Sequence, residues 1–199
     1  LNNYSNTDFP IAPVLFFEFH GTENGVREQV ELTQAITQEH GGLEFEWANR
    51  PEDRTKLWQA RHDAHYANIA ARPGMRGWVT DVCVPISRLA ECIAETSADI
   101  AQSKLFAPIV GHVGDGNFHV DFMLDPDDPG EVKEAGRLND RLVARALAMD
   151  GTCTGEHGVG FGKINYLRQE HGDGLDLMRD LKQSFDPHNL MNPGKVISL

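Results

Sequence analysis

The chain has 199 residues, a formal net charge of −12 and 40% hydrophobic residues, the composition of an ordinary soluble globular protein. The acidic excess argues against nucleic acid or an anionic membrane surface as the main partner, and any anionic substrate would need locally focused positive charge. No apolar run is long enough to span a bilayer, and no signal peptide is visible. Because the first residue is Leu1 rather than Met, we interpret the chain as a fragment or processed piece.

The first half of the chain predicts strands and helices in alternation. Residues 14–19 are β-branched and aromatic, and residues 43–48 alternate apolar with acidic side chains, so both ranges predict strands. Residues 23–39 and 54–70 carry apolar side chains at a helical period and predict helices.

The second half predicts a further strand, a helix, a hairpin and another helix, followed by a segment dense in glycine, two short helices and a tail rich in Pro and Asn. The ranges are a strand at 78–85, a helix capped by Ser87 and ending near 103, hairpin arms at 106–112 and 117–124, a helix at 131–149 and the glycine segment 151–162. This order predicts an α+β fold with a largely antiparallel sheet, helices on one face and a split βαβ, ferredoxin-like unit.

Cysteine usage indicates the compartment. Cys83, Cys92 and Cys153 show no Cys-x-x-Cys spacing and do not form a disulfide framework, so we expect buried thiols and a reducing, cytoplasmic location. A dinucleotide-binding Rossmann unit has weak support, because the segment at 111–114 has no Gly-x-Gly-x-x-Gly pattern followed by a helix.

Two histidines of the hairpin form the first candidate site. His112 and His119 flank Asp115-Gly116, a dipeptide typical of a two-residue type I′ turn. With that turn at the tip, His112 faces His119, and facing Cβ atoms lie about 4.5–5.5 Å apart. Two imidazoles at this spacing can share a metal ion such as Zn, Mn or Fe, with one carboxylate completing the set. Alternatively, Asp115 only shapes the turn and the histidines are structural.

The glycine segment supplies the best carboxylate. Four glycines surround Glu156-His157 and allow the backbone to approach another group closely. If Glu156 binds metal, His157 is free to act as a general base near neutral pH, although a histidine beside a glutamate is also commonly structural. Lys163 either adds local positive charge or is a solvated surface lysine.

Arginines are the candidates for carboxylate binding. The planar guanidinium bonds both oxygens of a carboxylate, and Arg61 shares its helix face with His65. Arg76 lies in the loop that follows, and both arginines have surface acids as alternative partners. The absence of a Gly-x-Ser-x-Gly elbow and of a Walker loop gives acyl transfer and nucleotide hydrolysis little support.

Five ordered segments together resemble the C-terminal domain of FAD-linked oxidases, with the cytochrome-linked D-lactate dehydrogenases most similar and glycolate oxidase and D-2-hydroxyglutarate dehydrogenase as relatives. The segments are residues 57–62, 80–89, 110–119, 151–163 and 190–195. The resemblance implies a duplicated ferredoxin-like arrangement over residues 1–199, with an N-terminal FAD-binding domain absent from this chain.

The resemblance also implies a function. The full-length enzyme would oxidise a D-2-hydroxy acid to the 2-oxo acid with hydride transfer to FAD, and D-lactate is the expected substrate. The electrons would then pass to a cytochrome or a quinone. The isolated chain would be inactive. The resemblance is compatible with assembly into an oligomer and with peripheral attachment of the enzyme to a membrane. In a eukaryote, it implies a mitochondrial location. Alternatives are a non-catalytic metal- or carboxylate-binding module and a stand-alone metal-dependent hydrolase.

The resemblance assigns roles to individual residues. It implies a divalent metal on His112, His119 and Glu156, with His157 acting on the substrate hydroxyl or adjacent carbon. It implies substrate contacts for Arg61, Asn117 and Lys163, specificity roles for His65 and Arg76, and a tail at Asn192 and Lys195 that returns toward the flavin.

Overall fold

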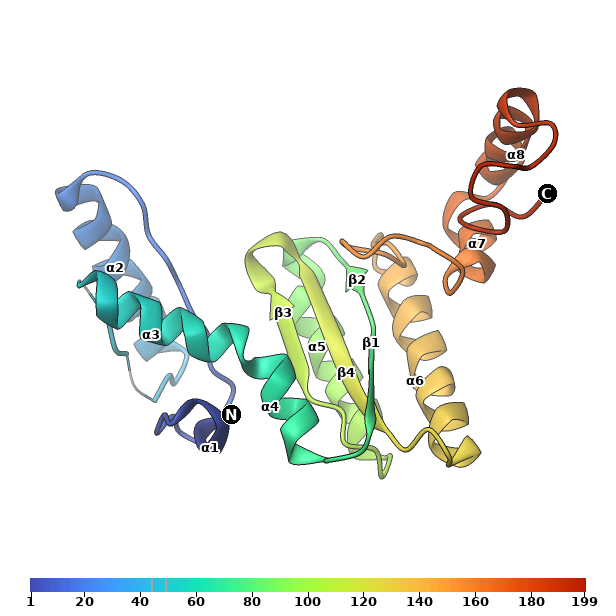
Figure 1. Cartoon of the computed structure of the whole chain (residues 1–199). Helices are drawn as coiled ribbons and strands as arrows, with labels where there is room; N and C mark the ends of the chain where they lie inside the picture. The colour runs from blue at the N-terminus through green and yellow to red at the C-terminus, as the bar shows by residue number, and fades with distance from the viewer. Residues whose placement is uncertain (44, 49) are drawn as a thin grey trace. The chain divides into compact units, whose positions relative to one another are not determined.

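The computed structural model describes residues 1–43, 45–48 and 50–199. The chain separates into two compact units, Leu1–Ala70 and Ala71–Leu199 (Figure 1). All three cysteines are free. Cys92 and Cys153 are fully buried, as the sequence predicts, but Cys83 is only half-buried, and its thiol donates to the carbonyl of Asp115. None of the helices among the described residues has both the length and the apolarity needed to cross a membrane.

The first unit is helical over its described residues. Its helices are α1 (Asn2–Ser5), α2 (Glu23–Glu39), α3 (Pro51–His62) and α4 (Ala64–Ala71), the last of which crosses the unit boundary by one residue. Helix α2 has the predicted bounds, and it begins there because the Thr22 side chain accepts the backbone N–H of Gly25.

The helix predicted at 54–70 is two helices. Backbone hydrogen bonds continue on both sides of Asp63, from Asp63 N to Gln59 O and from Ala67 N to Asp63 O, each 2.8 Å long. The ψ angle of Asp63 is −9°, less negative than the ideal helical value, and α3 ends at this residue before α4 begins at Ala64.

The strands predicted at 14–19 and 43–48 are wrong for the described residues, which form no strand there. Position 44 lies outside the described residues. A strand needs a neighbour for its N–H and C=O groups, and no described residue of the first unit supplies a ladder. Several apolar side chains of these segments are accordingly exposed, with Leu15 at 61% and Trp47 at 63%, whereas Phe16, Phe19 and Phe45 are half-buried.

The second unit is built around an antiparallel sheet (Figure 1). Strand β4 (Asn117–Leu124) is central; it pairs with β3 (Ile109–His112) on one side and with β1 (Arg76–Val79) and β2 (Val82–Cys83) on the other. The strand predicted at 78–85 is therefore divided at Thr80 and Asp81. At this break the Thr80 hydroxyl, not its carbonyl, accepts the Val120 N–H at 2.8 Å.

The two faces of β4 differ in polarity. Phe118, Val120, Phe122 and Leu124 point into the hydrophobic core, which α5 (Ile86–Ala101) and α6 (Pro129–Ala148) complete. The alternate residues Asn117, His119 and Asp121 lie on the opposite face and are also buried. This alternation puts a set of polar side chains on a rigid strand.

The first residues of α6 follow the usual capping preferences, whereas the predicted cap of α5 is wrong. Helix α6 begins where the Asp128 carboxylate accepts the N–H groups of Gly130 and Glu131, with Pro129 in the first position. Ser87 does not cap α5; the helix begins at Ile86, and Pro85 takes the capping position because proline can precede a helix but not continue one.

The order of elements in the second unit confirms the α+β class with both long helices on one face of the sheet. After α6, Thr152 pairs with Cys83, so the strand–helix–strand–strand–helix unit ends in a single antiparallel bridge where a fourth strand would lie. The chain then forms a short turn (η2, Ile164–Tyr166), α7 (Leu167–His171) and α8 (Gly174–Phe185). The implied duplication is not confirmed, because the described residues of the first unit form no strand.

Candidate metal and substrate site

The hairpin turn is longer than predicted, but it keeps both histidines on one face. The loop consists of the turn η1 (Val113–Asp115) and Gly116, so His112 pairs with Asn117 rather than with His119. This register differs from the predicted one by two residues, and a shift of two leaves every side chain on its original face. Gly116 has φ of +77°, and a Cβ there would lie 2.1 Å from Val84 O, so the position requires glycine.

Glu156 meets both histidines. Its Oε1 lies 3.0 Å from Nε2 of His119 and 3.9 Å from Nε2 of His112. One ligand atom from each of the three residues lies within 4.8 Å of the others. The His119 side chain is 10% exposed, whereas His112 is 54% and Glu156 47% exposed, so the cluster has one buried wall and one open side.

The hydrogen bond of His119 determines which ring nitrogen faces Glu156 as an acceptor. Nδ1 lies 2.9 Å from Thr80 O, a carbonyl that can only accept, so we assign the proton to Nδ1. In the neutral ring Nε2 then presents a lone pair toward the carboxylate of Glu156. Two acceptors 3.0 Å apart require a proton or a cation between them. This donor set, with its second nitrogen held by a carbonyl, fits a divalent metal.

His157 lies beside the cluster. Its ring stacks on His119 with centroids 4.8 Å apart and planes within 4°. Nε2 of His157 is 3.6 Å from Glu156 Oε1, and its side chain is 45% exposed. The ring is therefore close to the cluster and open to solvent or substrate on one side.

A buried aspartate that the sequence analysis did not select holds the loop that carries Glu156 and His157. Asp81 is fully buried and accepts hydrogen bonds from Asn117 Nδ2, Thr154 Oγ1, the backbone N–H groups of Glu156 and His157, and Lys163 Nζ. Burial alone would raise the pKa of this carboxyl, but the hydrogen bonds from Lys163, the His157 N–H and Asn117 hold it well below its usual range. An acidic residue inside an otherwise apolar strand was the available signal.

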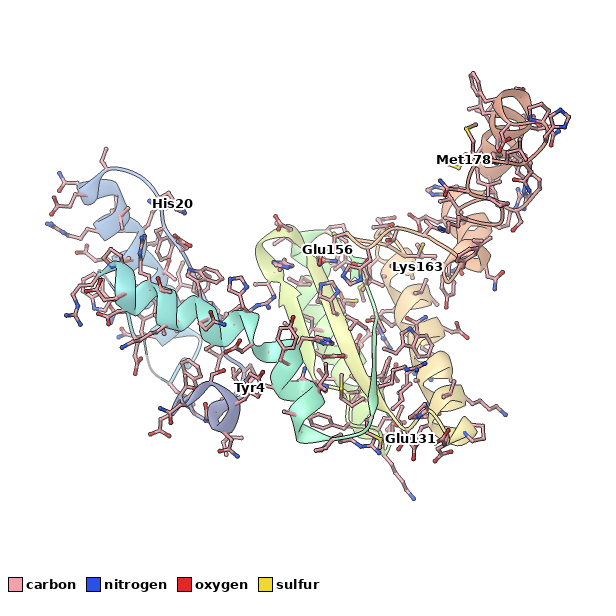
Figure 2. The ribbon with its side chains drawn as sticks, in the orientation of Figure 1. Tyr4, His20, Glu131, Glu156, Lys163 and Met178 are labelled. Atoms are coloured by element: carbon pink, nitrogen blue, oxygen red, sulfur yellow. The ribbon has the colours of Figure 1, made fainter. Side chains whose placement is uncertain are left out.

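Asn117 and Lys163, predicted to contact substrate, both contact Asp81. Asn117 Nδ2 donates to Asp81 Oδ1 and to Val82 O, each at 2.9 Å. Lys163 Nζ donates to Asp81 Oδ2 at 2.8 Å and to Asp81 O at 3.1 Å. Figure 2 shows Glu156 and Lys163 near the end of the sheet that carries β2. The contacts support a positioning role for both residues, and their substrate contacts stay a prediction.

Asp81, His119 and His157 form a second group close enough to share an ion. Asp81 is already saturated by its donors, and Nδ1 of His119 is committed to Thr80 O. The group of His112, His119 and Glu156 is therefore the better metal site.

The remaining predicted residues belong to other elements of the chain. Arg61 is in the last turn of α3 and His65 is in α4, both in the first unit, so their place beside the cluster stays a prediction. Arg76 pairs with Leu124, five residues along β4 from His119, a distance of about 17 Å at the usual rise per residue. This makes Arg76 the least supported of the substrate contacts.

The C-terminal tail returns to the glycine segment. Val196 N donates to Gly160 O at 2.8 Å, and the ammonium group of Lys195 lies 5.3 Å from the centre of the Phe161 ring. Asn192 has a left-handed backbone with φ of +46°, and its carbonyl accepts the N–H of Lys195. The tail is thus attached to the loop that carries Glu156 and His157.

Comparison with known proteins identifies the family. The family model for "FAD linked oxidases, C-terminal domain" matches residues 2–196. The chain belongs to this family. It is 53% identical over 199 residues to "Probable D-lactate dehydrogenase, mitochondrial" of Danio rerio, covering 100% of this chain and 40% of that protein. It is 45% identical over 198 residues to "D-lactate dehydrogenase [cytochrome], mitochondrial" of Arabidopsis thaliana, covering 99% and 35%.

A more distant relative has a different substrate in its name. A glycolate oxidase subunit of Bacillus subtilis is 29% identical over 201 residues, covering 100% of this chain and 42% of that protein. The chain therefore spans 35% to 42% of the length of these three relatives.

Proposed function

We propose that this chain is the substrate-binding part of an FAD-dependent D-2-hydroxy acid dehydrogenase. Its proposed substrate is D-lactate, and its product is the corresponding 2-oxo acid. The meeting of Glu156 Oε1 with the Nε2 atoms of His119 and His112 carries the proposal. The names of the relatives support the reaction class and favour D-lactate.

His112, His119 and Glu156 would hold a divalent metal such as Zn, Mn or Fe. A bound ion supplies Lewis-acid polarisation of the substrate hydroxyl, and FAD, held mainly by the rest of the protein, accepts the hydride. The open side of the cluster, formed by the exposed parts of His112 and Glu156, leaves room for a small substrate.

His157 accepts the hydroxyl proton on Nε2 in this proposal. Its ring is kept in place by stacking on His119, and the exposed edge is available to the substrate. Arg61 binds the carboxylate and so selects the face presented to the flavin, while His65 and Arg76 adjust the choice of hydroxy acid. Asn117 and Lys163 line the same site, and Asn192 and Lys195 carry the tail toward the flavin.

The wider context is also part of the proposal. The electron acceptor is a cytochrome or a quinone, which the name of the Arabidopsis relative supports for the cytochrome. The mitochondrial names of two relatives support a mitochondrial location for the full-length protein.

The test uses the full-length flavoprotein. The double variant His112→Ala with His119→Ala should lose nearly all bound metal by elemental analysis, and D-lactate turnover with an artificial acceptor should fall with it. His188→Ala, an exposed histidine outside the cluster, is the matched control and should retain both. Equal metal content in the double variant and the wild type would remove the ligand set.

Substrate choice needs a separate assay. We expect D-lactate to be turned over faster than glycolate and D-2-hydroxyglutarate, with L-lactate inactive as the stereochemical control. Binding of D-lactate without turnover of any hydroxy acid would favour the non-catalytic carboxylate-binding module.

A further inference from the structure

Asp81 lies in the break between β1 and β2, directly beneath the cluster. The antiparallel register that pairs Val79 with Asp121 and Val82 with Phe118 sets Asp81 opposite His119. Its side chain is 0% exposed, and its Oδ1 is 3.9 Å from Nδ1 of His119. A buried carboxylate in this place touches the predicted machinery without belonging to the ligand set.

The carboxylate joins three segments that are distant in the sequence. Oδ1 accepts from Asn117 of β4 at 2.9 Å and from the N–H of Glu156 at 3.1 Å. Oδ2 accepts from the N–H of His157 at 3.0 Å and from Lys163 Nζ at 2.8 Å. One side chain therefore connects the central strand, the loop and the lysine that follows the loop.

The two consecutive N–H groups determine where the Glu156 and His157 side chains leave the backbone. The peptide planes before these residues are held when both N–H groups donate to one carboxylate. Gly155 permits this close approach, because a Cβ on it would lie 2.0 Å from Asn117 Nδ2 and 2.9 Å from Asp81 Oδ1. Thr154 adds a hydroxyl donor to Oδ2 at 3.0 Å.

We propose that Asp81 is a positioning residue that sets the metal ligand Glu156 and the base His157 against the histidines of the hairpin. Asparagine cannot replace it, because its NH₂ group would face N–H and ammonium donors and its neutral side chain would leave Lys163 without a counter-charge. The inference rests on the proposed function for the roles of Glu156 and His157.

The experiment compares Asp81→Asn with Asp99→Asn in the full-length protein. Asp99 is also a buried aspartate with charged partners, but it lies between α5 and α6 and accepts from Arg141 and Arg145. Zn²⁺ affinity is measured by competition with a chromophoric chelator, and amide hydrogen exchange is followed over residues 154–158. We expect Asp81→Asn to bind Zn²⁺ about 10–100-fold more weakly and to accelerate exchange at Glu156 and His157. Asp99→Asn should change neither.

A milder pair keeps the test decisive if Asp81→Asn does not fold. Thr154→Val removes one donor to Asp81 and should weaken Zn²⁺ binding by about 2–10-fold, whereas Thr154→Ser keeps the hydroxyl and should restore it. The inference would be overturned if Asp81→Asn kept the wild-type affinity for Zn²⁺ and the wild-type rate of amide hydrogen exchange in the loop. Equal affinities for Zn²⁺ in Thr154→Val and Thr154→Ser would overturn it too.

The two readouts separate this inference from the proposed function. A wild-type protein that binds no Zn²⁺ contradicts the proposed metal site. The exchange data then decide alone: faster exchange confined to the loop in Asp81→Asn supports the anchoring role, and unchanged exchange overturns it.

Discussion

The two faces of β4 come from alternate residues of one strand, but they depend on different parts of the chain. Val120 and Phe122 face α5 and α6 in a continuous apolar core. His119 faces Glu156, which is 37 positions further along the chain and is held in place by Asp81. One face is completed by α5 and α6, the helices on either side of the β3–β4 hairpin in sequence, and the other by a loop that comes after α6. The core face should therefore govern stability, and the polar face should govern metal binding and turnover.

The largest expected effect is on the polar face. His157→Ala in the full-length flavoprotein should lower turnover of D-lactate by about 10²–10⁴-fold, because it removes the proposed base. Bound metal should remain, since His157 is outside the ligand set. Steady-state kinetics and elemental analysis together check this, and turnover near the wild-type value would remove His157 from the mechanism.

A change at the neighbouring position of His119 separates the two faces most sharply. Val120→Ala should lower the free energy of unfolding by about 2–3 kcal/mol, because Val120 is 1% exposed and its truncation leaves a cavity in the core. Zn²⁺ affinity of the folded protein should not change. His119→Ala is the counterpart and should abolish binding of Zn²⁺. A loss of metal in Val120→Ala of comparable size would show that the two faces are not separable.

Thr80 connects the faces, so its substitution should affect both. Its hydroxyl accepts the Val120 N–H and leaves its carbonyl for Nδ1 of His119. Thr80→Val keeps the shape of the side chain but removes the hydroxyl that accepts the Val120 N–H. We expect the free energy of unfolding to fall by about 1–3 kcal/mol and the affinity for Zn²⁺ to fall about tenfold. Urea unfolding and chelator competition measure the two effects; Thr80→Ser, which keeps the hydroxyl, should stay near wild type in both.

The smallest expected effect concerns Asp99, which lies between α5 and α6, and the dependence of the free energy of unfolding on pH. Burial would raise the pKa of Asp99, but hydrogen bonds from Arg145 and Arg141 lower it below its ordinary value. A lowered pKa in the folded state means that Asp99 stabilises the fold above about pH 4, and this contribution is lost as the pH falls. Urea unfolding at pH 7 and pH 3 should show a smaller pH dependence in Asp99→Asn than in the wild type. An unchanged difference would contradict the assignment.

Local patterns predicted the features that depend on neighbouring residues. Helix α2 has the predicted bounds because its apolar period and the Thr22 cap lie within one segment. The hairpin arms were predicted, but its register was not, since the four-residue loop depends on Gly116 approaching Val84 O, a contact outside the hairpin. The two histidines nevertheless lie on the predicted face, because the register differs by an even number of residues.

Features that depend on distant partners were harder to predict. Residues 14–19 have strand-like side chains, but pairing decides whether a strand forms, and no described residue of the first unit pairs with them. The role of Asp81 was missed, because it depends on donors at positions 154–163 that its own strand does not reveal. The meeting of Glu156 with His119 was predicted from glycine density and from the family resemblance, and the structure brings the three expected ligand atoms together.

The central claim is tested most directly by X-ray absorption spectroscopy of the purified full-length protein at the edge of its bound metal. The account predicts one ion with two imidazole nitrogens and one carboxylate oxygen among its ligands, at about 2.0–2.2 Å if the metal is zinc. The same spectrum from Glu156→Gln should lose the carboxylate contribution or the ion altogether. A wild-type protein without a bound metal, or an ion whose ligands are unchanged in Glu156→Gln, would contradict the account.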